Sequence, residues 1–577
     1  MNLTAEQRAI GKENFHAAIG SDLTRRDFLK GSVAAAGAAG IGLGAHYFAY
    51  SRVTDPIRVG MIGTGDEGSV LIGAHTPDYA KIVAIADIRP YNIHRAFHGD
   101  IEAPGPRPGL MAKYGWTSEG QARENVKVYT NDYHELLDDP AVEGVIIALP
   151  LHLHAKVAIE ALRKGKHVLT EKLMGHSVHE CKEMARVAQE TKLLLATGHQ
   201  RHYSILYDNA VDIIRQSLIG DIHHIRAQWH REKDSWLAPL PNKALQDELA
   251  ALEKKRDEAV GKPDLKRHED LNKQIQAKKD RLLDQVLTNA DAAKHGYQEK
   301  IIYDAAGKAI YTCSPLEELI RWRLWHRTGG GLMAELGSHQ LDASSIFISA
   351  DFERKLGRKI KVQPLSVSAV GGRHLYEANR DADDHVYCTF EFPGPDYYKD
   401  YDKREIGDAN KKIVVTYSSI NGNGFGGYGE TVLGTGGTLI LDKEQDVMLF
   451  GSGGAATSTN VSVTQSKAGA PALSTTESGG TPAAAVGKAG LEAGPVSKGY
   501  TEEIEHWAWC IRNPGDADSP NLPRCHPKVA LTDAVIALTS NIAIKENRRI
   551  EFKPEWFDID SDETPENVKP DLKRYDA

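Results

Sequence analysis

The chain has 577 residues, of which 41% are hydrophobic, and it carries a formal net charge of -9. A chain of this size and hydrophobicity can bury the core of a globular protein with more than one domain. The negative charge gives no electrostatic basis for binding nucleic acid. The five cysteines lack the Cys-x-x-Cys spacing that structural zinc sites use, so we expect neither a nucleic-acid partner nor a metal site.

The first fifty residues differ in kind from the rest. Arg25 and Arg26 open the segment RRDFLK, and an apolar run rich in Gly and Ala continues to about Ala49. This pattern resembles a twin-arginine export signal, so we leave residues 1–50 out of the fold. We expect the twin-arginine machinery as a partner and a periplasmic or otherwise exported protein. No clear Ala-x-Ala cleavage site follows, so an uncleaved signal that tethers the chain to the membrane is the alternative to release.

Residues 55–200 are predicted to form a Rossmann domain, a doubly wound α/β domain with a parallel sheet. The segments IRVGMIGTG, AKIVAIAD, VEGVIIALP and GKHVLTEK are short and apolar, as buried strands are. Helix-length segments separate them. Alternating strands and helices are typical of a parallel sheet covered by helices.

Residues 201–552 are predicted to form a second, α+β domain. Longer alternating segments such as DHVYCTFEF and KKIVVTYSS indicate a mostly antiparallel sheet with one open face. An insertion at residues 239–318 has leucines and isoleucines at helical spacing, which predicts a helical hairpin that serves as a solvated arm or oligomer contact rather than in catalysis. Residues 451–498 are poor in bulky apolar groups and predict a mobile loop, and residues 553–577 predict an acidic tail.

A glycine-rich turn follows the first predicted strand. Gly63 would allow the tight turn, Gly65 the approach of a pyrophosphate to the backbone, and Gly68 the close packing of helix on strand. Asp87 ends the next strand, where a carboxylate would bind the ribose hydroxyls and repel a 2′-phosphate. The turn therefore predicts a dinucleotide, with NAD favoured over NADP, although Arg89 nearby keeps NADP open.

Two further segments carry a resemblance to a known family. PLHLHAKVAIEALRKGKHVLTEKLM and GGGLMAELGSHQLDAS are similar to the two signatures of the Gfo/Idh/MocA oxidoreductases, in the right order. The likeness extends from about Ile57 to Glu551, apart from the insertion and the loop. It implies a Rossmann domain, a C-terminal domain whose open sheet often serves oligomerisation, and hydride transfer between NAD(P) and sugars, cyclitols or related polyols. We therefore expect a homo-oligomer with a small carbohydrate or polyol substrate.

The family's motif residues can be carried over position by position. Its Glu-Lys-Pro motif falls on Glu171, Lys172 and Leu173, so the resemblance places Lys172 between nicotinamide and substrate and Glu171 at the cofactor, with leucine in place of the usual proline. The family's histidine on the preceding loop falls on His154, which would line the nicotinamide pocket. The segment GHQRHY supplies two candidate substrate or cofactor contacts, Gln200 and Arg201.

The second signature supplies the candidate catalytic pair. The family's Asp-x-x-x-His falls on Glu335 and His339, with Asp342 one turn later as a candidate substrate contact. Residues four apart share a helix face, so Glu335 could orient His339. An imidazole is a natural acceptor for the carbinol proton, so we assign His339 as general base and Lys172 as the group that stabilises the alkoxide. Glutamate in place of the customary aspartate leaves open that Glu335 contacts the substrate itself.

The export signal and the dinucleotide motif together constrain function. An exported NAD enzyme has no soluble cofactor pool, so it should hold its nucleotide tightly and return it to its starting redox state in each cycle. The leading hypothesis is an exported NAD-dependent oxidoreductase that acts on a sugar, glycoside or cyclitol hydroxyl. An NAD-dependent glycoside hydrolase or lyase that uses transient oxidation and elimination is the second, and a non-catalytic sugar-binding protein is the third.

Overall fold

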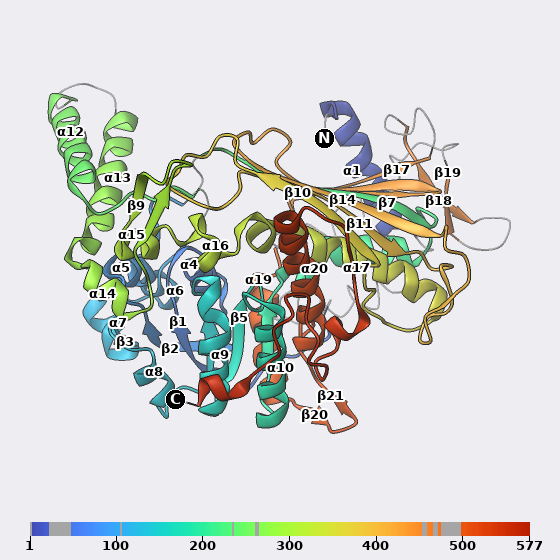
Figure 1. Ribbon diagram of the computed structural model, residues 1–577, viewed down its shortest axis with the longest axis horizontal. Helices are drawn as coiled ribbons and strands as arrows, with labels where there is room; N and C mark the ends of the chain where they lie inside the picture. The colour runs from blue at the N-terminus through green and yellow to red at the C-terminus, as the bar shows by residue number, and fades with distance from the viewer. Residues whose placement is uncertain are drawn as a thin grey trace.

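The computed structural model describes residues 3–21, 48–103, 107–233, 236–259, 265–452, 459–465, 471–474 and 498–576. Residues 22–47 of the predicted export signal (1–50) and most of the predicted loop at 451–498 lie outside these residues. Figure 1 shows two sheets side by side: the blue to teal part of the chain builds the first, and the green to orange part builds most of the second.

The first sheet has six strands, all parallel, in the order β3-β2-β1-β4-β5-β6. The strands are β1 (Ile57–Ile62), β2 (Ala80–Ala86), β3 (Lys127–Tyr129), β4 (Gly144–Ile147), β5 (His167–Glu171) and β6 (Leu195–Gly198). Helices α4 (Asp66–Ala74), α5 (Pro90–His98), α9 (His154–Arg163) and α10 (Val178–Thr191) connect them. The prediction of a doubly wound parallel sheet is confirmed.

The order of these strands fixes where a ligand can bind. The chain leaves β1 toward β2 on one side and later adds β4 on the other, so the order reverses between β1 and β4. In open parallel sheets the crevice beyond the carboxyl ends of the strands at such a reversal is the usual binding site. The glycine turn and the end of β5 both lie at this edge.

The second sheet has eight strands in the order β17-β16-β15-β7-β14-β11-β10-β22. Every neighbouring pair is antiparallel except β7 with β14, which run parallel, so the prediction of a mostly antiparallel sheet is confirmed. The strands are β7 (Ile222–Arg231), β10 (Ser366–Gly372), β11 (His385–Pro393), β14 (Lys412–Asn421), β15 (Tyr428–Gly434), β16 (Gly437–Asp442), β17 (Asp446–Gly451) and β22 (Ile550–Glu551).

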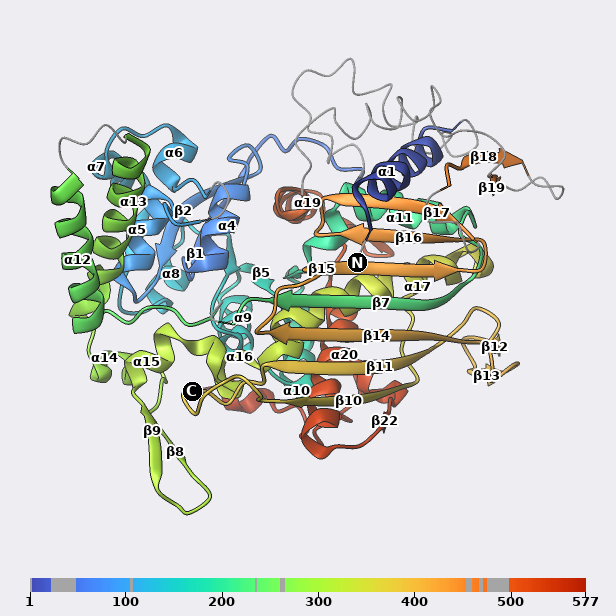
Figure 2. The same ribbon diagram turned by 90° about the horizontal axis from the view of Figure 1, so that it is seen from above.

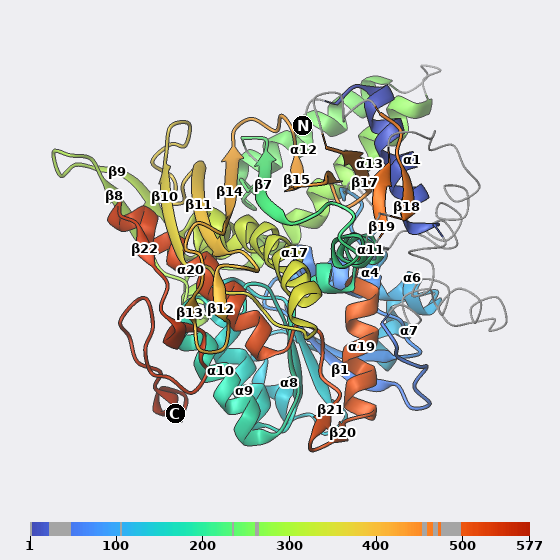
Figure 3. The same ribbon diagram turned by 90° about the vertical axis from the view of Figure 1, so that its right-hand side faces the viewer.

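Helices cover one face of the second sheet. Helices α17 (Ser338–Leu356) and α20 (Pro527–Glu546) pack against its strands, with α11 (Ile205–Arg215) beside α17 (Figures 2 and 3). Residues along β14 alternate between buried and partly exposed, as expected for a sheet with one covered face. Among the described residues, α20 alone has the length and apolar composition of a membrane-spanning helix, and 67% of that window is buried inside the protein.

The predicted hairpin is present in the insertion. Helices α12 (Lys243–Ala259) and α13 (Leu265–Arg281) pack against each other, followed by η3 (Leu282–Val286) and α14 (Asn289–Lys294). Figure 1 shows the hairpin beside α5, at the end of the first sheet that lies away from the second sheet. The sequence did not predict that its base contacts the Rossmann domain.

The prediction that the Rossmann domain ends at residue 200 does not hold, because segments from the end of the chain also pack on it. Helix α19 (Tyr500–Arg512) returns to pack on the first sheet, where Gly144 leaves room for Trp507: a Cβ there would lie 3.0 Å from its ring. The acidic tail also packs on this domain, because buried Lys182 of α10 donates hydrogen bonds to the carbonyls of Glu555, Ser561 and Glu563. Within the predicted loop, β18 (Ser462–Gln465) and β19 (Pro471–Ser474) pair antiparallel.

The exclusion of residues 1–50 from the fold is wrong for the described residues 3–21. Helix α1 (Ala5–Ile19) packs on β17 and buries Phe15. The Asn14 amide donates to Leu449 O at 2.9 Å, and its oxygen accepts from Val461 N at 2.8 Å. Gly11 allows the close approach, since a Cβ there would lie 2.5 Å from the ring of Phe450.

Candidate active site

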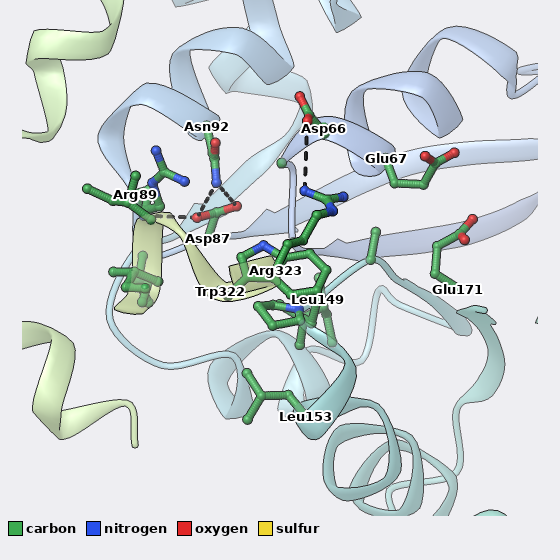
Figure 4. A pocket seen from close by; sticks show the side chains of 18 of the residues that line it. Asp66, Glu67, Asp87, Arg89, Asn92, Leu149, Leu153, Glu171, Trp322 and Arg323 are labelled. Carbon is green, nitrogen blue, oxygen red and sulfur yellow. Dashed lines mark hydrogen bonds and ion pairs between the residues drawn. The ribbon is translucent and has the colours of Figure 1, made fainter. Parts of the chain in front are cut away.

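One cavity of about 1720 Å³ lies at the carboxyl edge of the first sheet and extends to the second sheet and the insertion. The predicted site residues on its wall are Gly63, Gly65, Asp87, Glu171, Lys172, Gln200, Glu335 and His339. Figure 4 shows the part around the glycine turn. Residues that are hundreds of positions apart therefore face one space.

The glycine turn leaves the backbone accessible. Gly63 has φ +87°, and a Cβ there would lie 2.4 Å from Ala148 O. A Cβ on Gly68 would lie 2.4 Å from Gly63 O, so Gly68 packs α4 onto the turn and does not face the cavity. Gly65 is the N-cap of α4, and the nearest atom to a Cβ there is 3.7 Å away. This open approach to a helix N-terminus fits a dinucleotide diphosphate.

Acidic residues follow Gly65, and arginines offset their charge. Asp66 accepts hydrogen bonds from Arg95 at 3.0 Å and Arg107 at 3.3 Å, and Arg323 lies 3.9 Å away. Figure 4 shows Arg323 pointing toward Asp66 across the cavity. The three guanidinium groups thus offset the negative charge of Asp66 beside the turn.

Asp87 directly follows β2, at the position expected for a contact with the ribose. Its carboxylate accepts from Thr64 N and Arg89 N, at 2.8 and 2.9 Å, and from the Asn92 amide at 3.1 Å. The neighbouring Arg89 side chain does not face the cavity as a free cation. It is paired with Asp284 of the insertion, to which its Nε and Nη2 both lie at 2.8 Å.

Lys172 directly follows β5 and reaches across to the residues of the second signature. Its Nζ donates to Glu335 O at 2.9 Å and lies 3.7 Å from Glu335 Oε2. The Lys172–Leu173 peptide bond is cis. Beside it, burial and the nearby Glu67 carboxyl raise the pKa of Glu171 well above its usual value, while Lys172 N donates to Glu171 Oε2 at 3.1 Å.

Glu335 pairs with cations and not with His339. It lies in a π-helical turn (Met333–Gly337), and its Oε1 accepts from Arg323 Nε at 2.7 Å. Burial opposes ionisation, but Arg323 and Lys172 outweigh it and lower the pKa of Glu335 to about 2. The prediction that Glu335 orients His339 is therefore wrong, because the wider turn changes their angular offset and two cations hold the carboxylate.

His339 lines the cavity from the start of α17. Its buried Nδ1 has no hydrogen-bond partner among the described residues, and its ring centroid lies 5.3 Å from that of Trp229. Burial and the charges of Lys172 and Arg201 hold the pKa of His339 well below 6.5. The imidazole is thus neutral near pH 7 and can accept a proton.

Three predicted contacts do not line the cavity. His154 is buried, with Nδ1 2.9 Å from Leu173 O and Nε2 2.8 Å from Leu149 O, so it braces the loop that carries Lys172. Arg201 is buried: its Nη1 donates to Glu430 at 3.1 Å and to His339 O at 2.6 Å. The expectation that His154 and Arg201 contact nicotinamide or substrate is wrong, because buried acceptors hold both side chains.

Asp342, the third such residue, belongs to a buried polar cluster behind His339. It accepts from His202 Nε2 at 2.9 Å and from Lys361 Nζ at 3.0 Å, so it does not reach the substrate as predicted. Ligand atoms of His199, Asp342 and Asp533 lie within 4.8 Å of one another, as in a metal site. Lys361 Nζ lies 2.8 Å from Asp533 and already supplies a positive charge between the carboxylates.

The turn, the strand reversal and the acid at the end of β2 define a dinucleotide-binding Rossmann domain. Residues 57–199 match the Gfo/Idh/MocA family profile, described as "Oxidoreductase family, NAD-binding Rossmann fold". Residues 22–42 match the "TAT (twin-arginine translocation) pathway signal sequence", which supports export.

Curated relatives resemble part of the chain. A "Glycosyl hydrolase family 109 protein" of Stenotrophomonas maltophilia is 29% identical over 181 residues, which are 30% of this chain and 36% of that protein. An "Uncharacterized oxidoreductase" of Schizosaccharomyces pombe is 34% identical over 120 residues, which are 20% of this chain and 32% of that protein. The match thus spans about a third of each relative's length.

Solved structures cover more of the chain at lower identity. The aldose-aldose oxidoreductase from Caulobacter crescentus, complexed with glycerol, has 14% identity and a TM-score of 0.48, covering 86% of this chain and 100% of that one. A levoglucosan dehydrogenase in complex with NADH and L-sorbose has 17% identity and a TM-score of 0.47, covering 87% and 100%. Similarity at this level carries no conclusion about substrate.

Proposed function

We propose that the protein is an exported NAD-dependent oxidoreductase that acts on a hydroxyl group of a sugar, glycoside or cyclitol. The observation that carries the proposal is that the glycine turn, Lys172 and His339 face a single cavity. Gly63, Gly65, Asp87 and Glu171 would hold the dinucleotide, and Gln200 would contact nicotinamide or substrate.

The chemistry follows from two side chains. A nicotinamide bound in the cavity supplies the acceptor for the hydride that the carbinol carbon loses. Lys172 donates a hydrogen bond to the hydroxyl oxygen and stabilises the negative charge that develops there. His339 takes the hydroxyl proton, since its imidazole is neutral and its Nδ1 is unpaired within the described residues. One C–H and one O–H bond break, and the carbonyl forms.

Glu335 and Arg323 position Lys172. The carboxylate stays ionised because its pKa is about 2, and it lies between the two cations. An ionised partner keeps the lysine ammonium aimed at the cavity and balances its charge before substrate arrives. Glu335 is thus a positioning residue for Lys172 in place of its predicted role toward His339.

Aromatic rings beside His339 support a sugar substrate. Trp229 stacks on Tyr428 with ring centroids 4.4 Å apart, Arg231 lies 5.3 Å from the Trp229 ring, and all three line the cavity. Such a surface offers an apolar face for the C–H side of a pyranose and polar groups for its hydroxyls.

Export of the protein supports a nucleotide cofactor that stays bound to the enzyme between catalytic cycles. Because no soluble dinucleotide pool exists outside the cytoplasm, the nucleotide must be reoxidised or re-reduced in place within each cycle. The test is to incubate the purified enzyme with sugar pairs and glycosides without added nucleotide, and to identify products by mass spectrometry. An oxidised and a reduced product in equal amounts support the proposal, and no product from any substrate class counts against it.

Glycoside cleavage is a second candidate, favoured by the relatives described as glycosyl hydrolase family 109 proteins. Transient oxidation of a ring hydroxyl would acidify the adjacent C–H, elimination would expel the aglycone, water would add, and the hydride would return to the carbonyl. Release of nitrophenol from a nitrophenyl glycoside, with deuterium incorporated from solvent at the adjacent carbon, would select this reaction over simple oxidation.

We propose that the export signal stays attached and tethers the chain. Helix α1 precedes the twin-arginine segment and covers Met448 and Phe450 of β17. Cleavage after the signal would remove α1 and expose these residues. Intact-mass analysis of the exported protein checks this: a mass that includes residue 5 supports retention, and a mass that begins after residue 50 excludes it.

We also propose a homo-oligomer formed through the open face of the second sheet. Val370 and Tyr387 are paired neighbours on β10 and β11 and are 55% and 44% exposed. Exposed apolar neighbours on a flat sheet favour association. Light scattering of the wild type and of Val370→Asp measures it, with a smaller particle expected for the variant.

A further inference from the structure

The base of the insertion places a carboxylate beside the predicted ribose site. Asp284 in η3 is 1% exposed, although the hairpin above it is largely solvated. Its Oδ2 accepts from Arg89 Nε and Nη2, both at 2.8 Å, and its Oδ1 accepts from Tyr91 N at 2.9 Å. One oxygen of Asp284 thus accepts hydrogen bonds from the Arg89 side chain, 195 residues away in sequence. The other accepts from the backbone at the start of α5, 193 residues away.

These partners form an anion site. Helix α5 has Arg89 as N-cap and Pro90 at its first position, and its N-cap makes no side-chain hydrogen bond, so Tyr91 N is available to an outside acceptor. A helix N-terminus and a guanidinium together favour a negative charge. Arg89 follows Asp87 by two residues and lines the same cavity. An arginine at this place is the group that accommodates the 2′-phosphate of NADP in Rossmann domains.

We infer that Asp284 occupies this anion site in place of a 2′-phosphate and so makes the protein specific for NAD over NADP, an inference that rests on the proposed function. A 2′-phosphate would have to displace a buried carboxylate from two charge-assisted hydrogen bonds and would also face Asp87. NAD, whose ribose carries hydroxyls there, meets neither penalty.

Other contacts hold the insertion in place independently of Asp284. Arg281 donates to Glu102 at 2.7 Å, and its guanidinium lies 5.4 Å from the Tyr91 ring. Below it, Tyr297, Ala292 and Leu319 form a small apolar cluster with Ile88, which directly follows Asp87. A change of Asp284 alone should therefore free Arg89 without detaching the hairpin.

The test measures binding of each nucleotide to the full-length protein, stripped of nucleotide, by equilibrium dialysis with NAD+ and NADP+. Asp284→Ala should raise the affinity for NADP+ by about 10-fold or more, because a freed arginine can then bind phosphate. Asp270→Asn, an exposed charge change on the same hairpin, should leave both affinities unchanged. Arg89→Ala with Asp284→Ala should lose the gain.

The outcomes separate two failures. A wild type that binds NAD+ and an Asp284→Ala variant, folded by circular dichroism, that rejects NADP+ as strongly as the wild type does would overturn the role of Asp284 alone. Should Asp284→Ala not fold, Asp284→Asn is measured in its place with the same expectation. A wild type that binds neither nucleotide would overturn the proposed function together with this inference.

Discussion

The two ends of the cavity are built in different ways. At the nucleotide end, Gly63, Gly65 and Asp87 come from one stretch of chain, and backbone geometry fixes them. At the reaction end, Lys172 and His339 come from separate domains, and buried side chains hold them in place. The first end depends on space for a backbone approach, and the second on charge balance, so mutations should affect them differently.

Replacing Lys172 should have the largest effect on turnover while leaving nucleotide binding unchanged. Lys172→Ala should lower kcat by about 1000-fold, because the developing alkoxide loses its cationic donor, while the nucleotide stays bound. Turnover and bound nucleotide are measured on the same preparation. Lys156→Ala, a change at a half-exposed lysine on the same cavity wall, is the matched control and should keep full activity. Wild-type turnover in Lys172→Ala would contradict the mechanism.

His339→Ala should lower kcat by roughly 100- to 10,000-fold through loss of the base. The pH profile of the wild type sharpens the assignment. Because burial and Lys172 lower the pKa of His339 well below 6.5, the base stays unprotonated and kcat/KM should show no acid limb near pH 6.5. The limb should appear only at lower pH. An acid limb at pH 6.5 to 7 that His339→Ala removes would contradict the assigned pKa shift.

At the nucleotide end, Gly65 and Gly63 form an informative pair. Gly65→Val adds a Cβ whose nearest neighbour lies 3.7 Å away, an ordinary van der Waals contact, so the fold should persist while affinity for NAD falls roughly 100-fold, or about 2.7 kcal/mol. Gly63→Ala meets Ala148 O at 2.4 Å and should lower stability by roughly 1–3 kcal/mol. Thermal melts and nucleotide binding separate the two effects. Equal melting temperatures for both variants would count against the described turn geometry.

Glu335→Gln tests the charge balance at the reaction end. Removing the carboxylate leaves Arg323 and Lys172 without their shared partner, so kcat should fall roughly 10-fold with KM little changed. Glu335→Asp should recover part of the rate, which a purely structural role would not predict. If Glu335→Gln instead raised KM alone, the residue would be a substrate contact, the alternative that the sequence left open.

The smallest effect is expected far from both ends. Gly11→Leu would place its Cβ 2.5 Å from Phe450 and release α1 from β17. Activity should stay within about twofold, while the N-terminal helix becomes sensitive to protease, since α1 contacts neither cavity end. A large loss of turnover would show that α1 influences the site.

Much of the fold could be predicted because alternation and periodicity are local properties. The parallel first sheet, the open second sheet and the hairpin all follow from the hydrophobic patterns of single segments. The parallel pairing of β7 with β14 and the return of α19 to the first sheet could not be predicted. Both depend on contacts between segments distant in sequence, which no local pattern encodes.

The site divides in the same way. Motifs identified Gly63, Asp87, Lys172 and His339, all of which line the cavity. They missed Arg323, and they misplaced Arg201 and Asp342, because a side chain's orientation depends on buried partners from other elements. Asp284 lies in an insertion with no motif, and only the folded chain brings it to Arg89.

The central claim is that the cavity holds NAD(H) through each cycle, and bound nucleotide tests it most directly. The exported protein is purified without added nucleotide and denatured, and the supernatant is assayed for NAD, NADH and their phosphorylated forms. The account predicts about one NAD(H) per chain and no NADP(H). A site that is empty after purification and fails to bind added NAD+ would contradict it and indicate a non-catalytic sugar-binding protein with this fold.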